Sequence, residues 1–255
     1  MERFDVVVIG GGGAGITASV AAARWGAKVL LCERSNKTGG DCTWTGCIPS
    51  KALIKCASVM HSVRTSTKYG IVAGVGIPPD PAATLHCDFA AIKAHLHKSQ
   101  NSIYEHDDSP EVLQRHGVQV RLNTEVRFTS SHELSLHSIP AATSTTAGNS
   151  SGTNSDASVS EGGGVGEITR CFADKVIVAV GAQPTLPSRV QCPDDSARAA
   201  IVTSDTIWDR LNACGERVPE AVVVLGGGPM GCELAQALAR LGTTGERLEC
   251  GGMYV

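Results

Sequence analysis

Two cysteines and a lysine stand close together in a short segment of the chain, which reads Cys42-Thr-Trp-Thr-Gly46-Cys47-Ile-Pro49-Ser-Lys51. Residues five apart in an ideal helix lie roughly 8–9 Å apart between Cα atoms, and a disulfide tolerates at most ~7 Å. Gly46 and Pro49 permit a non-helical loop in which the two thiols can meet. The segment therefore allows a reversible disulfide, with a metal-binding pair or two unrelated buried thiols as alternatives.

A helix is predicted from Pro49 to about Arg64, with the proline in its first turn. Cys47 would lie at the start of this helix, where the helix dipole favours the thiolate form. Lys51 adds a positive charge one turn further on. Two cysteines are too few for a zinc site, and no two further ligands are evident nearby.

A glycine pattern near the start of the chain indicates a nucleotide-binding loop. Gly10-x-Gly12-x-x-Gly15 follows a strand expected at Phe4–Ile9 and opens a helix expected at Ala14–Trp25. Gly10 allows a tight turn, Gly12 lets the backbone approach a pyrophosphate, and Gly15 permits close packing of helix on strand. The pyrophosphate would lie at the helix N-terminus.

An acidic residue completes this pattern. Glu33 ends a second strand expected at Lys28–Cys32, and it would accept hydrogen bonds from the ribose hydroxyls of an adenosine. Strand, helix and strand together form a βαβ unit. A glycine-rich turn without a ligand is the alternative.

A second loop of the same type occurs late in the chain, as Gly226-x-Gly228-x-x-Gly231-x-Glu233. It lies between a strand expected at Ala221–Leu225 and a helix expected at Cys232–Leu241. Glu233 could also be an ordinary acid of a first helical turn, which the dipole favours. No apolar strand is expected after Gly242.

Taken together, these motifs resemble those of a known enzyme family. The segment Gly39-Gly40-Asp-Cys42 through Lys51 resembles the active-site signature of class I pyridine nucleotide–disulfide oxidoreductases. That family includes glutathione reductase, dihydrolipoamide dehydrogenase and mercuric reductase, and Asp41 with Thr-Trp-Thr most resembles the mercuric reductase-like branch. The resemblance covers residues 4 to about 241.

The resemblance implies a role for each residue of the site. Cys42 would be the interchange thiol that meets the substrate, and Cys47 would lie against the flavin. Lys51 would lie near flavin N5 and pair with Glu233. Electrons would pass from NAD(P)H to FAD, then to a Cys42–Cys47 disulfide, and then to a disulfide or metal-ion substrate.

Further glycines are implied as cofactor contacts. Gly181 follows a strand that resembles the one closing the family's first FAD segment, although Val180 stands where that segment usually has threonine. The residues expected to contact FAD or NAD(P) are Gly10, Gly12, Gly15, Glu33, Gly40, Lys51, Gly181, Gly226, Gly228 and Gly231.

The expected fold is α/β, a Rossmann-like FAD/NAD(P)-binding fold with three layers in the arrangement ββα. Its second nucleotide-binding domain is expected to be incomplete. Residues 1–190 would form the FAD-binding domain, with a disordered insertion at about 140–167. Residues 191–220 would form a connector, and 221–255 the start of a truncated NAD(P)-binding domain. The dimer-forming interface domain of this homodimeric family is expected to be missing.

Between the two loops, further elements are expected from periodicity. Antiparallel strands are predicted at Val118–Leu122, Glu125–Phe128 and Glu133–Leu136, and further strands at Ile168–Ala173 and Lys175–Val180.

Composition restricts the remaining classes of function. The net charge of −3 gives no basic footprint for nucleic acid or an anionic membrane. Four consecutive glycines interrupt the apolar start of the chain, which favours a strand–turn–helix over a signal peptide. We therefore expect a cytoplasmic protein.

No resident metal is expected. We expect Cys32, Cys171 and Cys232 to be buried structural thiols.

Two function hypotheses follow. The motifs favour an FAD-dependent disulfide or metal-ion reductase. The alternative is a catalytically incompetent fragment or truncated isoform of such an enzyme, at most a partial FAD-binding module.

Overall fold

The computed structural model describes residues 1–71, 86–140, 167–186, 190, 192–243 and 246–249. They form two compact units, one of Met1–Gly40 with His106–Gly181 (unit 1) and one of Asp41–Glu105 with Ala182–Val255 (unit 2). The expected domain boundaries near residues 190 and 220 remain predictions. Residues 141–166 of the expected insertion lie outside the described residues.

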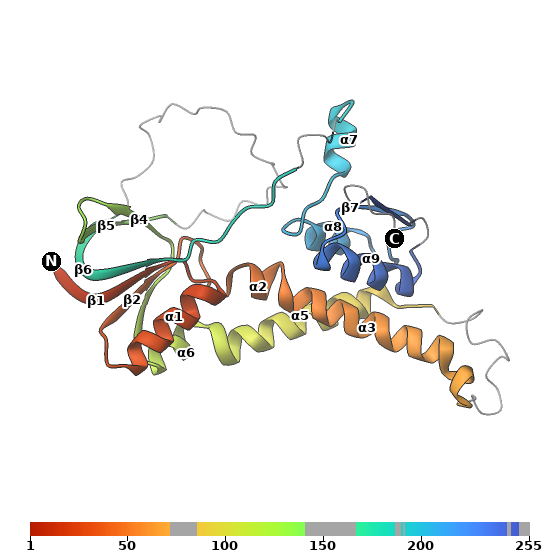
Figure 1. Ribbon diagram of the computed structural model, residues 1–255, viewed down its shortest axis with the longest axis horizontal. Coiled ribbons are helices and arrows are strands. Elements are labelled where there is room, and N and C mark those ends of the chain that lie inside the picture. The colour runs from red at the N-terminus through yellow and green to blue at the C-terminus, as the bar shows by residue number, and fades with distance from the viewer. Residues whose placement is uncertain (72–85, 141–166, 187–189, 191, 244–245, 250–255) are drawn as a thin grey trace. The chain divides into compact units, whose positions relative to one another are not determined.

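Unit 1 is built on a six-stranded sheet in the order β3-β2-β1-β6-β5-β4 (Figure 1). Its β1 pairs in parallel with β2 and β6, and β2 in parallel with β3, whereas β5 pairs antiparallel with β4 and β6. The strands are β1 (Glu2–Ile9), β2 (Val29–Cys32), β3 (Val118–Arg121), β4 (Thr124–Phe128), β5 (Glu133–Ser138) and β6 (Ile168–Val178).

Two details of this sheet correct the sequence-based expectations. The strand at Val118–Arg121 was expected to be antiparallel but pairs in parallel with β2, because alternation of polar and apolar residues reports a half-exposed edge, not a direction. The two strands expected at 168–173 and 175–180 are a single strand, β6. Its first half pairs with β5 and its second half continues along β1.

The core of unit 1 lies on both faces of the parallel strands. Every residue of β2 is buried. Its residues form an unbroken apolar run, which is typical of a strand that is covered on both faces of the sheet. The face with α1 (Gly13–Arg24) and α6 (Pro110–Arg115) buries Val8, Ile16, Val29, Leu31, Leu113 and Val118. The face with β5 buries Phe4, Val7, Leu30, Leu134, Leu136 and Ala173. Helices, parallel strands and antiparallel strands confirm the expected three-layer α/β fold.

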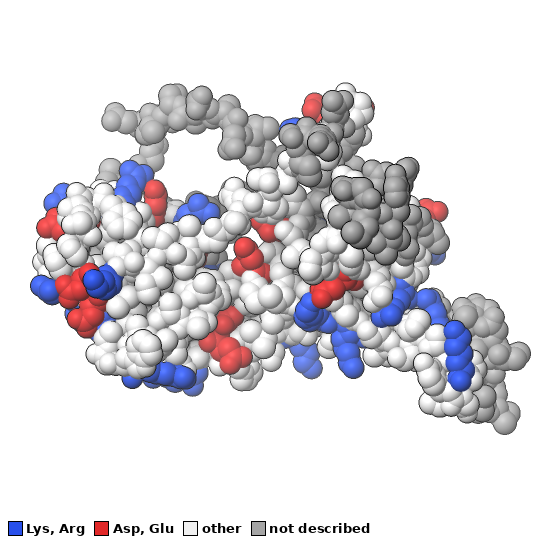
Figure 2. Space-filling view, in the orientation of Figure 1, with Lys and Arg blue, Asp and Glu red and all other residues white. Residues whose placement is uncertain are grey.

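Acidic and basic side chains lie together at the end of the sheet where β1 starts (Figure 2). Lys28 Nζ is 3.1 Å from Glu2 Oε1, and Arg3 Nη2 is 2.6 Å from Asp174 Oδ1. These exposed pairs contribute at most about 1 kcal/mol each, so the buried apolar layers hold the unit together.

Unit 2 is mainly helical. Its elements are α2 (Gly40–Trp44), which starts at the last residue of unit 1, α3 (Cys47–Thr65), the 3-10 helix η1 (Ser66–Tyr69), α5 (Phe89–Ile103), the π-helix η2 (Tyr104–Asp108) at the boundary with unit 1, α7 (Asp195–Ala200), α8 (Ile207–Ala213), β7 (Val222–Leu225), α9 (Pro229–Leu241) and β8 (Glu246–Glu249). One apolar cluster joins α3, α5, α8 and α9, and it includes Leu53, Ala57, Phe89, Leu96, Trp208, Leu211, Leu234 and Leu238.

The strand β8 was not expected. It pairs in parallel with β7 through Val222↔Glu246 to Leu225↔Glu249, so β7, α9 and β8 form a second βαβ unit. The expectation failed because it required apolar residues, whereas pairing of a strand depends on backbone N–H and C=O groups that every non-proline residue carries.

None of the helices in the described ranges combines the length and the apolar character of a membrane-spanning segment.

Candidate functional site

Cys42 and Cys47 lie on either side of a break between two helices of unit 2. Cys42 belongs to the short helix α2, and Cys47 is the first residue of the 19-residue helix α3. A Cβ atom on Gly46 would lie 2.9 Å from the Asp41 carbonyl oxygen, so the tight passage between the helices requires glycine. Cys42 is half-buried and Cys47 is exposed.

The break between α2 and α3 leaves two backbone carbonyls that accept hydrogen bonds from side chains of α5 and α8. Gln100 Nε2 donates a hydrogen bond to the Trp44 carbonyl at 2.8 Å, and Trp208 Nε1 donates one to the Thr45 carbonyl at 2.6 Å. Both donor side chains are buried. Neither residue could be identified from the sequence. Pro49 was the one signal, because a proline has no N–H to donate to the carbonyl four residues before it.

Lys51 and Glu233 form an ion pair between α3 and α9. Lys51 Nζ lies 2.5 Å from Glu233 Oε2, and the side chains are 60% and 41% exposed. The contact expected between these residues is present, while their part in the chemistry remains a prediction. A cavity of ≈ 280 Å³ adjoins the pair and is lined also by Ile54, Ala57, Gln236, Ala237 and Arg240.

The first glycine loop in unit 1 has the geometry that its spacing predicted. Gly10 has φ 106°, which favours glycine, and a Cβ atom on Gly15 would lie 1.8 Å from the Gly10 carbonyl oxygen. Gly12 is the N-cap of α1 and brings no side chain to the helix start. The N–H groups of the first turn therefore point to a place where an anion can bind.

Glu33 is held beside this loop. Its Oε2 accepts the Gly11 N–H at 2.6 Å and its Oε1 accepts the Ser35 N–H at 2.7 Å. Each carboxylate oxygen has a second lone pair, so hydroxyl groups of a ribose can still be accepted. The two backbone contacts were not expected, and they fix the carboxylate in place.

Gly39 and Gly40 pass close to the same loop. Gly12 and Gly39 form a parallel bridge, and Gly40 has φ 56°. A Cβ atom on Gly40 would lie 2.6 Å from Gly12 Cα, so the two glycine backbones lie directly against each other. The helix start without a side-chain cap fits the pyrophosphate of FAD, and the fixed carboxylate beside it fits the adenosine.

The second glycine loop, in unit 2, repeats the first. Gly226 has φ 112°, and a Cβ atom on Gly231 would lie 2.2 Å from the Gly226 carbonyl oxygen. Gly228 is the N-cap of α9, and a Cβ atom there would meet nothing within 4 Å. These residues fit the pyrophosphate of a second dinucleotide.

Gly181 is exposed at the end of unit 1 and has φ 73°. Among the described residues, no hydrogen bond or ion pair joins it to the other predicted site residues, so its contact with a cofactor remains a prediction.

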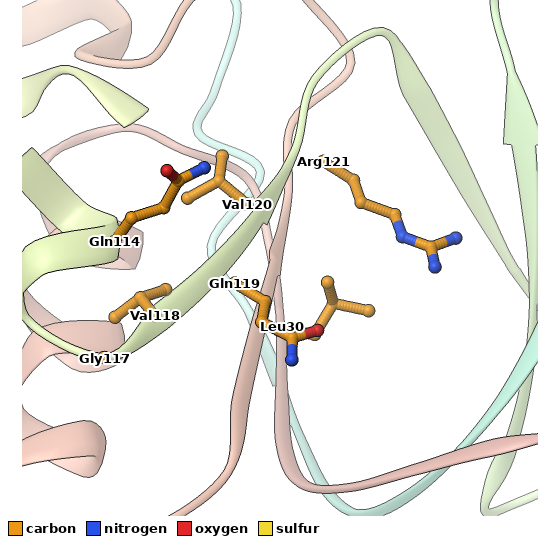
Figure 3. A pocket seen from close by; sticks show the side chains of 7 residues that line it. All are labelled: Leu30, Gln114, Gly117, Val118, Gln119, Val120 and Arg121. Carbon is orange, nitrogen blue, oxygen red and sulfur yellow. The ribbon is translucent and has the colours of Figure 1, made fainter. Parts of the chain in front are cut away.

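A further cavity of ≈ 460 Å³ lies along the edge strand β3 (Figure 3). Its lining is Leu30, Gln114, Gly117, Val118, Gln119, Val120 and Arg121, and it contains no predicted site residue. The described residues hold no group of three or more side chains able to bind a metal ion.

Two of the three cysteines expected to be structural are buried. Burial raises the pKa of the Cys32 thiol to about 12, helped by the neighbouring Cys171 and opposed by Arg121. Burial also raises the pKa of Cys171. Cys232 is exposed on α9, so that expectation was wrong: it lies on the side of the amphipathic helix away from Leu234 and Leu238.

The fold and the two glycine loops define a class of α/β proteins that bind dinucleotides. Residues 4–249 match the family model of pyridine nucleotide-disulphide oxidoreductases, and the chain belongs to this family.

Proteins with sequences similar to this chain include a reductase and a dehydrogenase. The chain is 33% identical to a mercuric reductase of Serratia marcescens and 29% identical to a dihydrolipoyl dehydrogenase of Trypanosoma brucei brucei, in each case over 94% of this chain. It spans 43% and 41% of their lengths.

A solved structure, the HOCl-induced flavoprotein disulfide reductase RclA of Escherichia coli, aligns with a TM-score of 0.65 at 21% identity. The alignment covers 98% of this chain and 43% of that one, and at this identity it supports the fold alone.

Proposed function

We propose that the chain acts in an FAD-dependent oxidoreductase whose redox-active disulfide forms between Cys42 and Cys47. The observation that carries this proposal is the position of the two cysteines around the Gly46 break, with Cys47 at the start of a long helix. FAD, when bound, supplies the two-electron chemistry that links NAD(P)H to this disulfide.

The chain's own residues divide the remaining tasks. Cys42 is the interchange thiol that attacks the substrate, and Cys47 is the thiol on the flavin side. Lys51, held by Glu233, places a positive charge one turn after Cys47. The first loop, with Gly10, Gly12, Gly15, Glu33 and Gly40, binds FAD, and Gly181 lies at the end of that unit. The second loop, with Gly226, Gly228 and Gly231, binds NAD(P)H.

The substrate class that suits this site is a small disulfide or a metal ion. A dithiol reduces a disulfide by exchange: the first thiolate attacks one sulfur and releases the other as a thiol, and the second thiol then displaces the bound half. Two electrons and two protons leave the protein. The complete enzyme would work as a homodimer, as the family does.

Trapping of a mixed disulfide tests the proposal. The reduced chain is mixed with dithiobis(nitrobenzoate), a small aromatic disulfide, and modified peptides are identified by mass spectrometry. The wild-type chain should release two equivalents of aromatic thiol at this pair and end with a Cys42–Cys47 disulfide. The Cys47→Ser variant should stop at a mixed disulfide on Cys42, since the resolving thiol is gone.

Stable mixed disulfides on both Cys42 and Cys47 of the wild-type chain would contradict the proposal, because they would show that the two thiols cannot reach each other. The exposed Cys232 serves as the control, because it should form a simple adduct in every variant.

A further inference from the structure

The break between α2 and α3 creates two carbonyl groups that the helices cannot satisfy. In an uninterrupted helix the Trp44 carbonyl would accept the N–H of Ile48, and the Thr45 carbonyl would accept that of Pro49. Proline has no N–H, so the Thr45 carbonyl needs a donor from elsewhere in the fold. Both carbonyls belong to the four-residue segment between Cys42 and Cys47.

Two side chains from distant parts of the sequence donate to these carbonyls. Trp208, in α8, binds the Thr45 carbonyl, and Gln100, in α5, binds the Trp44 carbonyl. A carbonyl oxygen only accepts, so the amide nitrogen of Gln100 must face it, and the indole N–H of Trp208 can only donate. The orientation of both bonds is therefore determined.

The donors are themselves held in place. Trp208 is 8% exposed and Gln100 is 7% exposed, and Trp208 belongs to the apolar cluster of unit 2 with Leu53 and Leu211. The Trp44 ring packs against Tyr104 with centroids 5.3 Å apart, which fixes the loop on a further side. A hydrogen bond in such a buried place is costly to leave unmade.

We propose that Gln100 and Trp208 are positioning residues for the Cys42–Cys47 pair. By holding the two carbonyls between the cysteines, they limit the conformations of the loop and raise the effective concentration of one thiol at the other. Because they order the loop while both cysteines are free thiols, they favour closure of the disulfide. The inference rests on the proposed function, because it assumes that this pair is the redox couple.

The equilibrium with glutathione measures this effect. Two cysteine thiols and one glutathione disulfide give one Cys42–Cys47 disulfide and two glutathione thiols, so two electrons and two protons pass to glutathione. The 255-residue chain is equilibrated at a series of glutathione ratios, quenched with an alkylating reagent and analysed by mass spectrometry.

Trp208→Phe removes the indole N–H and keeps an aromatic ring in the core. We expect it to lower the equilibrium constant for disulfide formation about fivefold, the effect of one lost hydrogen bond. Gln100→Met, which removes the amide and keeps the side-chain length, should act in the same direction. Trp25→Phe is the matched control, since Trp25 is 89% exposed in unit 1 and should leave the constant unchanged.

The possible outcomes separate the two proposals. A wild-type chain that forms no Cys42–Cys47 disulfide at any ratio contradicts the proposed function. A wild-type disulfide whose equilibrium constant neither variant changes contradicts only the positioning role. Circular dichroism reports whether each variant folds, and if Trp208→Phe does not, Gln100→Met on a separate helix decides.

Discussion

At the scale of single residues, the candidate site depends on contacts between positions far apart in the sequence. Lys51 and Glu233 were expected to pair because of the family resemblance, and the pair is present. Gln100 and Trp208 could not be named from sequence, because a buried polar donor has no periodic signature and its partner is a backbone carbonyl. Pro49 showed only that a donor was needed.

A substitution in the Lys51–Glu233 ion pair tests whether the pair contributes to the stability of the fold. Glu233→Gln should lower the free energy of unfolding by less than about 1 kcal/mol, because both side chains are well exposed. Denaturant unfolding of the variant measures it, with Glu125→Gln in the exposed Arg127–Glu125 pair as control. A loss of several kcal/mol at Glu233 alone would show that the pair holds the fold together and would weaken its assignment to the site.

Cys32 predicts how stability depends on pH. Its pKa is raised from 9.0 to about 12 in the folded chain, because burial disfavours the thiolate. The contribution of this thiol to the free energy of unfolding is therefore complete below pH 9 and is lost as the pH rises toward 12. This single group contributes a slope of at most about 1.4 kcal/mol per pH unit in that window. The free energy of unfolding of Cys32→Ala should therefore fall less steeply between pH 9 and 12 than that of the wild-type chain. Parallel curves for the two proteins would contradict this explanation.

At the scale of elements, the two strand–loop–helix units follow one geometric rule. In each loop, a Cβ atom on the third glycine would collide with the carbonyl of the first, at Gly15 against Gly10 and at Gly231 against Gly226. The spacing of the glycines is enough to predict both strand–loop–helix units, because the contacts that form each loop are between residues close in the sequence. The parallel direction of β3 and the existence of β8 depend on pairing with distant strands, which local patterns do not reveal.

The glycines of the first loop should separate folding from binding. Gly15→Ala should lower the free energy of unfolding by about 2 kcal/mol or more, because the methyl group must displace backbone. Gly12→Ala should leave stability nearly unchanged, since its Cβ would have room, but should weaken FAD binding at the approach to the pyrophosphate. Thermal unfolding and flavin fluorescence titration measure the two effects. Equal stability of both variants would show that the close packing at Gly15 is unimportant.

At the scale of the whole molecule, the chain has two compact units, each with its own buried core and its own glycine loop. It spans less than half the length of the mercuric reductase and dihydrolipoyl dehydrogenase that it resembles. Family membership therefore comes from the matched residues 4–249, and the activity of the complete enzyme is proposed from the site.

The two loops should respond to different nucleotides. FAD should slow hydrogen exchange of the backbone amides from Gly12 to Gly15, and NAD(P)H should slow exchange at the loop from Gly226 to Met230. The reason is that each helix start presents its N–H groups to one pyrophosphate. Protection of the second loop by FAD, with none at the first, would reverse the assignment of the two loops.

The proposed function depends on a reversible disulfide between Cys42 and Cys47, and peptide mapping detects this bond directly. The chain is oxidised mildly, alkylated, digested and analysed by mass spectrometry with and without a reductant. We expect one peptide that contains both cysteines and carries an internal Cys42–Cys47 disulfide, which reduction opens to give two alkylation sites. Cys42 and Cys47 both alkylated after oxidation, with no link between them, would contradict the claim.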